Sequence, residues 1–455
     1  MKTPFKRSLK VFAALLVILF FGLGTSDGGR VRQNKRIGRI SRRPARDLRV
    51  ERPVVRRRTP RYASDRVLVR FRPRVHRSYA EGLLRSYGFP SVRRIPAIGV
   101  YSVRTAPGVS VTETLAMLRR NADVEQARPD YRTRLADIPN DQYFAMFQYN
   151  LRNPGGILDL GDDIQLQAKA NADIKASAAW DAVKGDPEVV IAVCDTGVDM
   201  THPDLAAKIV SAGHDFANDD DDATDDHWHG THVAGIAAAD TDNSTGIAGV
   251  AWKCRILPVK VTDATGDGYY SWVIDGIIWA TDEGADVINI SLGGDFDDPF
   301  LEDACKYAHD HGVVVVASAG NDTAYINYPA AYDSYVLAVA ANDYSDEVAD
   351  FSSFGPEVDV AAPGVYILGP APQWYVGIGD PPYLFGSGTS MAAPHVSGMA
   401  ALIMSLKPEL KPAEVMKVIR YTADDVNRAA YPGRDDHAGY GRINMQRALV
   451  PYILK

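Results

Sequence analysis

Four side chains that together could transfer an acyl group are spread along this 455-residue chain. Asp195 and Asn321 each follow an apolar run that is typical of a buried strand. His229 and Ser390 each begin a segment rich in Gly and Ala, which predicts a helix packed closely on a sheet. Taken singly, each residue has a simpler interpretation, such as a strand-ending carboxylate, a turn amide or a helix-capping hydroxyl. Their combination is what points to chemistry.

The combination supplies every group that a serine nucleophile needs. An imidazole such as His229 can take the hydroxyl proton of Ser390, and a carboxylate such as Asp195 fixes the tautomer of that imidazole and stabilises its cation. The amide of Asn321 and the N–H groups at the start of the Ser390 helix can donate to an oxygen that becomes negative. These residues therefore predict acyl transfer with an oxyanion site.

Metal-dependent and thiol chemistry fit the sequence less well. His232 follows His229 by three residues, but no Glu completes an HExxH pattern, and we expect His232 to face the core. The 3 cysteines, Cys194, Cys254 and Cys305, show no CxxC or Cys/His metal spacing. Because an odd number gives no disulfide framework, we expect buried thiols that behave as small apolar side chains.

Alternating strand-like and helical segments position these side chains. Near-continuous apolar runs, separated by helical patterns, predict strands that are buried on both faces of a parallel sheet. The fold class is therefore α/β, a doubly wound and mostly parallel sheet flanked by helices. Such a fold places its site beyond the carboxyl ends of the strands. The predicted strands are residues 189–194, 256–261, 287–290, 313–317 and 336–340.

The N-terminus has the pattern of a secretory signal peptide, predicted over residues 1–26. Basic residues precede the apolar run 11–21, and small residues follow it. The run is shorter than the roughly 20 residues that span a bilayer. We therefore expect a secreted, extracellular protein; an uncleaved membrane anchor is the alternative.

Residues 27–61 are predicted to be a disordered linker, because residues 30–61 contain 13 Arg and 1 Lys but few apolar residues. The linker could be a solvated spacer, or it could bind anionic lipid or a cell-wall polymer.

A small α+β domain is predicted over residues 62–135, before the main domain at 136–455. Its pattern reads strand, helix, strand, helix, strand and indicates a ferredoxin-like layer. Residues 1–135 carry 32 Lys/Arg and 9 Asp/Glu, whereas the rest carries 18 Lys/Arg and 48 Asp/Glu. The two parts could attract each other. The Asp-rich excess of the main domain suits oxygen-ligated cations and argues against nucleic-acid binding.

Five motifs resemble those of the subtilisin family of serine peptidases, in particular its thermitase-like bacterial members. The motifs are DTGVD, HGTHVAG, SLGG, ASAGN and GTSMAAPHVSG, and the resemblance covers roughly residues 62–450. The chain order Asp, His, Ser is also that of subtilisin. The resemblance implies a serine endopeptidase in which Asp195 is the triad acid, His229 the general base and Ser390 the nucleophile. It also implies that Asn321 and the backbone N–H of Ser390 form the oxyanion hole.

The same resemblance implies a cleft that binds protein and peptide substrates as an added strand. Residues 266–272 and 291–294 would form its edges, and Tyr270 would line the pocket for the fourth residue before the scissile bond. The small, uncharged walls of the primary pocket imply broad preference for large apolar or aromatic residues, although Asp322 could favour a basic group. That pocket comprises Ser291, Leu292, Gly293, Gly294, Ala319, Gly320 and Asn327.

Two acidic loops are implied to hold structural Ca2+, because hard oxygen ligands suit calcium. The alternative in each case is a solvated acidic loop. The first set of ligands is Asp141, Asp204, Asp240, Asn243, Thr245 and Ile247. The second set is Asp215, Asn218, Asp220 and Asp222.

The domain at 62–135 resembles the family's N-terminal propeptide, which assists folding and then inhibits. We expect an autoprocessed zymogen, cut near residues 132–138, and a monomer with its own propeptide as an intramolecular inhibitor. Residues 366–385 form a longer approach to the nucleophile than the family minimum, which would reshape the cleft beyond the scissile bond. Two rival hypotheses are a non-catalytic binding module locked by its prodomain and a membrane-tethered processing protease.

Overall fold

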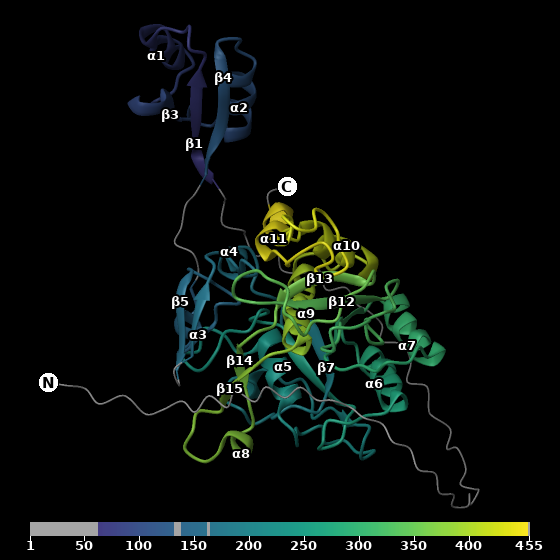
Figure 1. Ribbon diagram of the computed structural model, residues 1–455. Helices are drawn as coiled ribbons and strands as arrows, with labels where there is room; N and C mark the ends of the chain where they lie inside the picture. The colour runs from purple at the N-terminus through teal and green to yellow at the C-terminus, as the bar shows by residue number, and fades with distance from the viewer. Residues whose placement is uncertain (1–61, 132–137, 162–163, 454–455) are drawn as a thin grey trace, which may run out of the picture. The chain divides into compact units, whose positions relative to one another are not determined.

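The computed structural model describes residues 62–131, 138–161 and 164–453 (Figure 1). Its described residues form two compact units, one before and one after residues 132–137. The predicted signal peptide 1–26 and linker 27–61 lie outside the described residues, as does nearly all of the expected cleavage region. Within the described ranges, no helix is long and apolar enough to cross a bilayer.

The first unit is a four-stranded antiparallel sheet in the order β2-β3-β1-β4. Its chain order is that of a split βαβ fold, which agrees with the ferredoxin-like prediction. Strand β2 was not predicted, because four residues with two arginines give no alternating pattern. The elements are β1 Tyr62–Phe71, α1 Arg77–Ser86, β2 Val92–Ile95, η1 Pro96–Ile98, β3 Val100–Arg104, α2 Val111–Arg119 and β4 Val124–Tyr131.

The second unit is built on a seven-stranded sheet in the order β13-β12-β11-β10-β7-β9-β8. Every pairing in this sheet is parallel, as the apolar runs predicted. The strands are β7 Val190–Asp195, β8 His214–Asp215, β9 Arg255–Lys260, β10 Val287–Ile290, β11 Val314–Ser318, β12 Val336–Asn342 and β13 Val358–Pro363.

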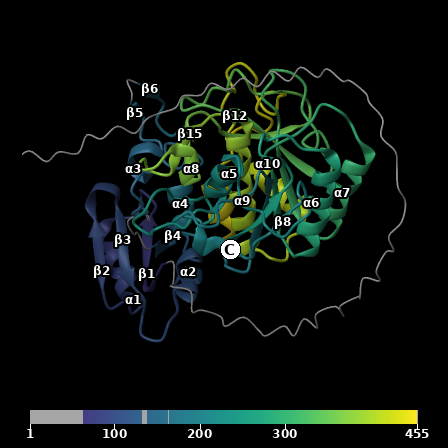
Figure 2. The same ribbon diagram turned by 90° about the horizontal axis from the view of Figure 1, so that it is seen from below.

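Helices cover both faces of this sheet. Side chains alternate along a strand, so Ile191 and Val193 pack in one buried cluster while Ala192 and Cys194 pack in the other. Helices α6 Tyr270–Asp282 and α7 Pro299–Asp310 bury one face and lie side by side in both views (Figures 1 and 2). The other face is covered by α4 Ala176–Trp180, α5 His229–Ala238, α9 Thr389–Leu406, α10 Pro412–Thr422 and α11 Met445–Ile453.

Two hairpins and three short helical segments complete the unit. The hairpin of β14 Ile367–Pro370 and β15 Tyr383–Gly386 leads directly to α9 and carries α8 Gln373–Val376 in its loop. The other elements are α3 Phe144–Phe147, β5 Gly156–Gly161, β6 Ile164–Ala168 and η2 Ala206–Lys208. The three cysteines are buried and unpaired, as predicted.

Candidate active site

The predicted acid, base and nucleophile stand at one edge of the main sheet. Asp195 is the last residue of β7, which has β9 on one side and β10 on the other. This is the point where a doubly wound sheet changes direction and opens a crevice. His229 is the first residue of α5, and Ser390 is the second residue of α9.

The carboxylate and imidazole are in direct contact. His229 Nδ1 lies 2.7 Å from Asp195 Oδ1, which also accepts a hydrogen bond from the Thr196 N–H at 2.8 Å. The side chain of Asp195 is only 1% exposed. Burial lowers the pKa of His229, but the charge and hydrogen bond of Asp195 outweigh that effect and raise the pKa above its ordinary value. The contact places the proton of the neutral ring on Nδ1 and leaves the Nε2 lone pair to act as a base.

Asp225 is a buried carboxylate that the sequence analysis did not single out. Its Oδ1 accepts from the hydroxyl of Thr196 at 2.9 Å and from the N–H groups of His227 and Trp228 at 2.9 and 3.0 Å. Its Oδ2 accepts from the N–H of Thr231 at 3.0 Å and from the hydroxyl of that residue. Burial raises its pKa, and these hydrogen bonds oppose the shift. Its position a few residues before a helix that begins His-Gly-Thr is the sequence feature that could have indicated a role for Asp225 near the base.

The hydroxyl of Ser390 does not bond to the imidazole in this structure. Ser390 Oγ donates to the carbonyl oxygen of Ser291 at 2.9 Å, while Ser291 Oγ donates to the carbonyl oxygen of Ser390 at 2.9 Å. The hydroxyl proton must therefore leave the Ser291 carbonyl oxygen before a base can take it. Such contacts often tighten only when substrate is bound.

Asn321 is held so that its amide nitrogen is the free donor. Its Oδ1 accepts from both the N–H and the hydroxyl of Thr389, each at 2.9 Å. Thr389 is the first residue of α9 and precedes Ser390, so the contact ties Asn321 to the start of the nucleophile helix. An amide NH2 beside a helix N-terminus is suited to a developing oxyanion.

The segments of the predicted primary pocket come together. Residues 291–294 follow β10 and residues 319–320 follow β11. Gly294 and Tyr328 exchange backbone hydrogen bonds at 3.0 and 2.9 Å, and the N–H of Asn327 donates to Ala319 at 3.0 Å. A Cβ added to Gly293 would lie 3.0 Å from the Cβ of Asn327, and one added to Gly320 would lie 2.9 Å from its Oδ1. Small residues are therefore required here for the walls to meet.

Tyr270 stands at the edge of this pocket. It begins α6, and its hydroxyl donates to the carbonyl oxygen of Phe296 at 2.9 Å. A Cβ on Gly294 would lie 2.5 Å from that hydroxyl. Leu292, in the same turn, packs against the core cluster of the α6 face.

His232 is a core residue, as predicted. Its Nε2 lies 3.2 Å from the carbonyl oxygens of Ile367 and Leu384, on the two strands of the hairpin before α9. Burial lowers its pKa to about 3, so the ring stays neutral. Because its Nε2 contacts the hairpin carbonyls, we assign His232 a packing role.

Hydrogen bonds join the first predicted calcium loop to Asp141 and Asp204, although the described residues hold no metal-binding group of three or more His, Cys, Asp or Glu side chains, so this site stays a prediction. Asp141 accepts from the N–H of Asp242, and burial raises the pKa of Asp141 to about 6. Asp204 Oδ2 accepts from the N–H of Ile247 at 2.9 Å, and the backbone of Asp240 donates to the carbonyl oxygen of Asp204 at 2.8 Å. These buried oxygens, two of them carboxylates, are the hard donors that Ca2+ prefers.

The amide of Asn243 fits a cation only after reorientation. Its Nδ2 donates to Asp204 Oδ1 at 3.0 Å, while its Oδ1 accepts from the N–H of Thr245. To bind a cation beside Asp204, the Asn243 amide would have to turn so that its oxygen, rather than its nitrogen, faces Asp204. Gly246 is required next to it, because a Cβ there would lie 2.1 Å from Asp204 Oδ2.

The second predicted loop uses its carboxylates within its own turns. Asp215 accepts from Asn218, Asp220 from Asp222, and Asp222 from Thr224. Across the described part of the chain, no group of three or more His, Cys, Asp or Glu side chains is arranged to hold a metal. The structure therefore does not gather this set, and the second calcium site stays a prediction.

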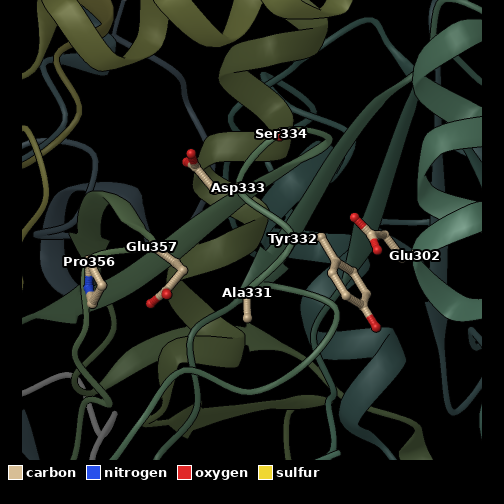
Figure 3. Close-up of a pocket in the computed structure, with 7 residues that line it drawn as sticks. All are labelled: Glu302, Ala331, Tyr332, Asp333, Ser334, Pro356 and Glu357. Atoms are coloured by element: carbon tan, nitrogen blue, oxygen red, sulfur yellow. The ribbon is translucent and has the colours of Figure 1, made fainter. Parts of the chain in front are cut away.

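A polar pocket lies apart from the four predicted catalytic residues, beside α7 and the start of β13 (Figure 3). Three acidic side chains contribute to its lining, and none of the predicted catalytic residues does. It is lined by Glu302, Ala331, Tyr332, Asp333, Ser334, Pro356 and Glu357.

Each of the two units matches a known protein family. Residues 186–441 match the model of the subtilase family (Peptidase S8), and residues 49–130 match that of the fervidolysin N-terminal prodomain. A thermophilic serine proteinase of Bacillus sp. (strain AK1) is 39% identical over 391 residues, covering 86% of this chain and 88% of that protein. Thermitase of Thermoactinomyces vulgaris is 42% identical over 313 residues, covering 68% of this chain and 99% of thermitase.

Solved structures give the same match. Fervidolysin from Fervidobacterium pennivorans, described as a keratinolytic enzyme related to subtilisin, aligns with a TM-score of 0.56 and 32% identity. That alignment covers 86% of this chain and 61% of fervidolysin. A protease of Pseudoalteromonas arctica aligns with a TM-score of 0.59 and 32% identity, covering 70% of this chain and 100% of the other.

Proposed function

The chain belongs to the subtilase family, as a serine endopeptidase with an N-terminal prodomain, and we propose that it is a secreted enzyme that cleaves proteins through an acyl-enzyme on Ser390. The observation that carries this proposal is the 2.7 Å contact between His229 Nδ1 and Asp195 Oδ1 at the switch point of the sheet. That contact leaves His229 Nε2 free to serve the nucleophile.

In the first half of the reaction, His229 Nε2 takes the proton of Ser390 as Oγ attacks the substrate carbonyl carbon. The carbonyl oxygen becomes negative and accepts hydrogen bonds from Asn321 Nδ2 and the Ser390 N–H. Asp195 stabilises the imidazolium, which then gives its proton to the leaving amine. The C–N bond breaks, and the acyl group stays on Oγ as an ester.

In the second half, His229 activates a water molecule that attacks the ester carbonyl carbon. The same donors hold the oxyanion, the C–Oγ bond breaks, and Ser390 recovers its proton from the imidazolium. The products are a carboxylic acid and an amine, so a peptide bond and one water are consumed.

The primary pocket supports broad specificity for large apolar or aromatic residues before the scissile bond. Its walls at residues 291–294 and 319–320 bear small or apolar side chains, so a large uncharged group would meet little polar surface. Because Asp322 directly follows Asn321, a substrate with a basic side chain at this position is the alternative. Kinetics with Phe, Leu and Arg at this position would separate the two.

We further propose that the residues before the catalytic domain act as an autoprocessed propeptide and that one Ca2+ stabilises the first acidic loop. Similarity of residues 49–130 to a subtilase prodomain supports the first point. Buried oxygens of Asp141 and Asp204, with backbone carbonyls of the loop, support the second; the ion would hold the loop and take no part in peptide hydrolysis.

Hydrolysis of casein by the purified full-length chain tests this function. We expect activity in the culture supernatant, loss of activity after treatment with a fluorophosphonate, and a new N-terminus near residues 132–138 by mass spectrometry. The Ser390→Ala variant should neither process itself nor hydrolyse casein. Ser405→Ala, near the far end of the same helix, is the matched control; it removes a hydroxyl that bonds to the backbone of Asp186 and Ala401, and it should still process itself and hydrolyse casein.

Two results would contradict the proposal. Self-processing by Ser390→Ala equal to that of the wild type would remove Ser390 as the nucleophile and favour a binding module. Activity found only in membrane pellets would instead favour a tethered processing protease.

A further inference from the structure

A row of four aromatic rings runs outward from the predicted base. The ring of Trp228 lies 5.6 Å from that of His229 and stacks on His227 at 5.7 Å. Trp228 also lies 5.7 Å from Tyr375, which in turn lies 5.8 Å from Trp374. We call His227, Trp228, Tyr375 and Trp374 the aromatic wall. Its members come from the turn before α5 and from α8.

The outer end of the aromatic wall is open to solvent. Trp374 is 58% exposed and Tyr375 is 47% exposed, and the nearby Ile378 is fully exposed. The loop at residues 371–382 contains a single charged residue, Asp380. Exposed aromatic and aliphatic groups that gather in one place mark binding surfaces more often than scattered ones do.

The loop that carries the outer rings is held in one shape by its own contacts. Gln373 Nε2 donates to the carbonyl oxygens of Gly377 and Asp380 at 2.7 and 3.0 Å. The N–H of Ala371 donates to Pro382 at 2.9 Å and closes the base of the loop. A loop fixed in this way loses little conformational entropy when it binds a ligand.

The aromatic wall has an acyl end and a leaving-group end. At His227, a Cβ added to Gly266 would lie 3.6 Å from Nε2, so this end meets the expected cleft edge for residues before the scissile bond. The wall then passes His229, which must protonate the leaving amine. Trp374 is at the opposite end, on the hairpin whose strand β15 leads to Ser390.

We propose that Tyr375 and Trp374 bind aromatic or large apolar side chains of the substrate polypeptide on the leaving-group side of the scissile bond. This inference rests on the proposed function, because it needs a polypeptide that passes His229. Trp and Tyr rings contribute strongly to binding when they are covered, since they bury a large area and stack on other rings. The shortage of charge in the loop favours an apolar occupant over a charged one.

The test compares three substrates that share the same residues before the scissile bond. Two are internally quenched peptides with either Phe or Ala at the three positions after the bond, and the third is a p-nitroanilide with no residue there. We expect the wild type to prefer the Phe peptide. In Trp374→Ala and Tyr375→Ala that preference should fall about 5- to 30-fold, mainly through KM. Tyr421→Ala removes a Tyr that is 65% exposed on α10 and serves as the control that keeps the preference.

The outcomes separate the inference from the function on which it rests. An unchanged Phe-over-Ala preference in both variants overturns the inference, as does an equal loss on the anilide and on both peptides. A wild type that dimerises through this loop, with variants that do not, overturns it in favour of a second copy as the occupant. If the wild type cleaves none of the three substrates, the proposed function itself fails.

Discussion

Replacing Asp225 by Asn tests whether one buried carboxylate sets the position of the predicted base. Its Oδ2 accepts two hydrogen bonds from Thr231, two residues after His229, and its Oδ1 accepts from Thr196, the residue after Asp195. The carboxylate therefore joins the turn that follows the acid to the helix turn that carries the base.

The expected cost follows from these contacts. An Asn that keeps one oxygen on the Thr196 side puts an NH2 group where Oδ2 was, so the Thr231 N–H loses its acceptor. A buried donor without a partner costs about 1–3 kcal/mol, and loss of the charge weakens the remaining bonds, so we expect the free energy of unfolding to fall by about 2–4 kcal/mol. Because a misplacement of about 1 Å near the chemistry can cost about 10²-fold in rate, we expect kcat to fall about 10- to 100-fold, with a smaller change in KM.

Unfolding of Asp225→Asn should be measured in the Ser390→Ala background, where self-digestion does not distort the melting curve. The pH profile of kcat/KM in the active enzyme is the readout that simple destabilisation would not move, because the lost charge of Asp225 and a looser contact of His229 with Asp195 would each lower the pKa of His229 and shift the acid limb to lower pH. Asp219→Asn makes the same chemical change at an exposed residue with φ of 56°, a conformation that Asn tolerates, and is the control. Unfolding, kcat and a pH profile that all match this control would refute the reasoning.

Three further predictions concern other parts of the site. The raised pKa of His229 means that the base is protonated and inactive at low pH, so the acid limb of kcat/KM should lie above pH 6.5; Asp195→Asn should move it to lower pH and reduce kcat about 10⁴-fold. Asn321→Ala should reduce kcat about 10²- to 10³-fold with little change in KM, a range known from a subtilisin that lost one such donor; an unchanged kcat would show that Asn321 is not part of the oxyanion site. Excess EGTA should lower the melting temperature and speed self-digestion, and Asp204→Asn should abolish that dependence; an unchanged melting curve would exclude the calcium.

The sequence predicted the parts of the site that depend on local pattern. Strands β7, β10 and β11 are mostly apolar because both faces are covered, and that pattern also located Asp195 at the end of a strand and Asn321 shortly after one. The small residues after His229 and Ser390 predicted the helices α5 and α9, which pack tightly against the sheet and against each other. The local sequence pattern therefore predicts both the fold class and the principal catalytic residues.

Features set by contacts between distant segments were not predictable in the same way. Strand β8 has two residues, too few for any periodicity, and exists because it pairs with β9. The rotamer of Ser390, which donates to Ser291, depends on a residue 99 positions away. Asp225 looks like any acidic loop residue until its five donors are brought to it by the fold.

The turn before α5 is held by Asp225 and also carries Trp228 of the aromatic wall. Trp228 has a φ of 150°, which a bulky residue adopts at a cost of about 1–3 kcal/mol and which a glycine would adopt freely. Asp225 offsets part of that cost by accepting the N–H groups of both His227 and Trp228. The Trp228 ring packs against the buried ring of His232 and a core cluster, and it also contacts Tyr375 of the aromatic wall. We therefore expect the turn to serve two purposes at once, holding His229 against Asp195 and presenting an aromatic surface to the chain being cut.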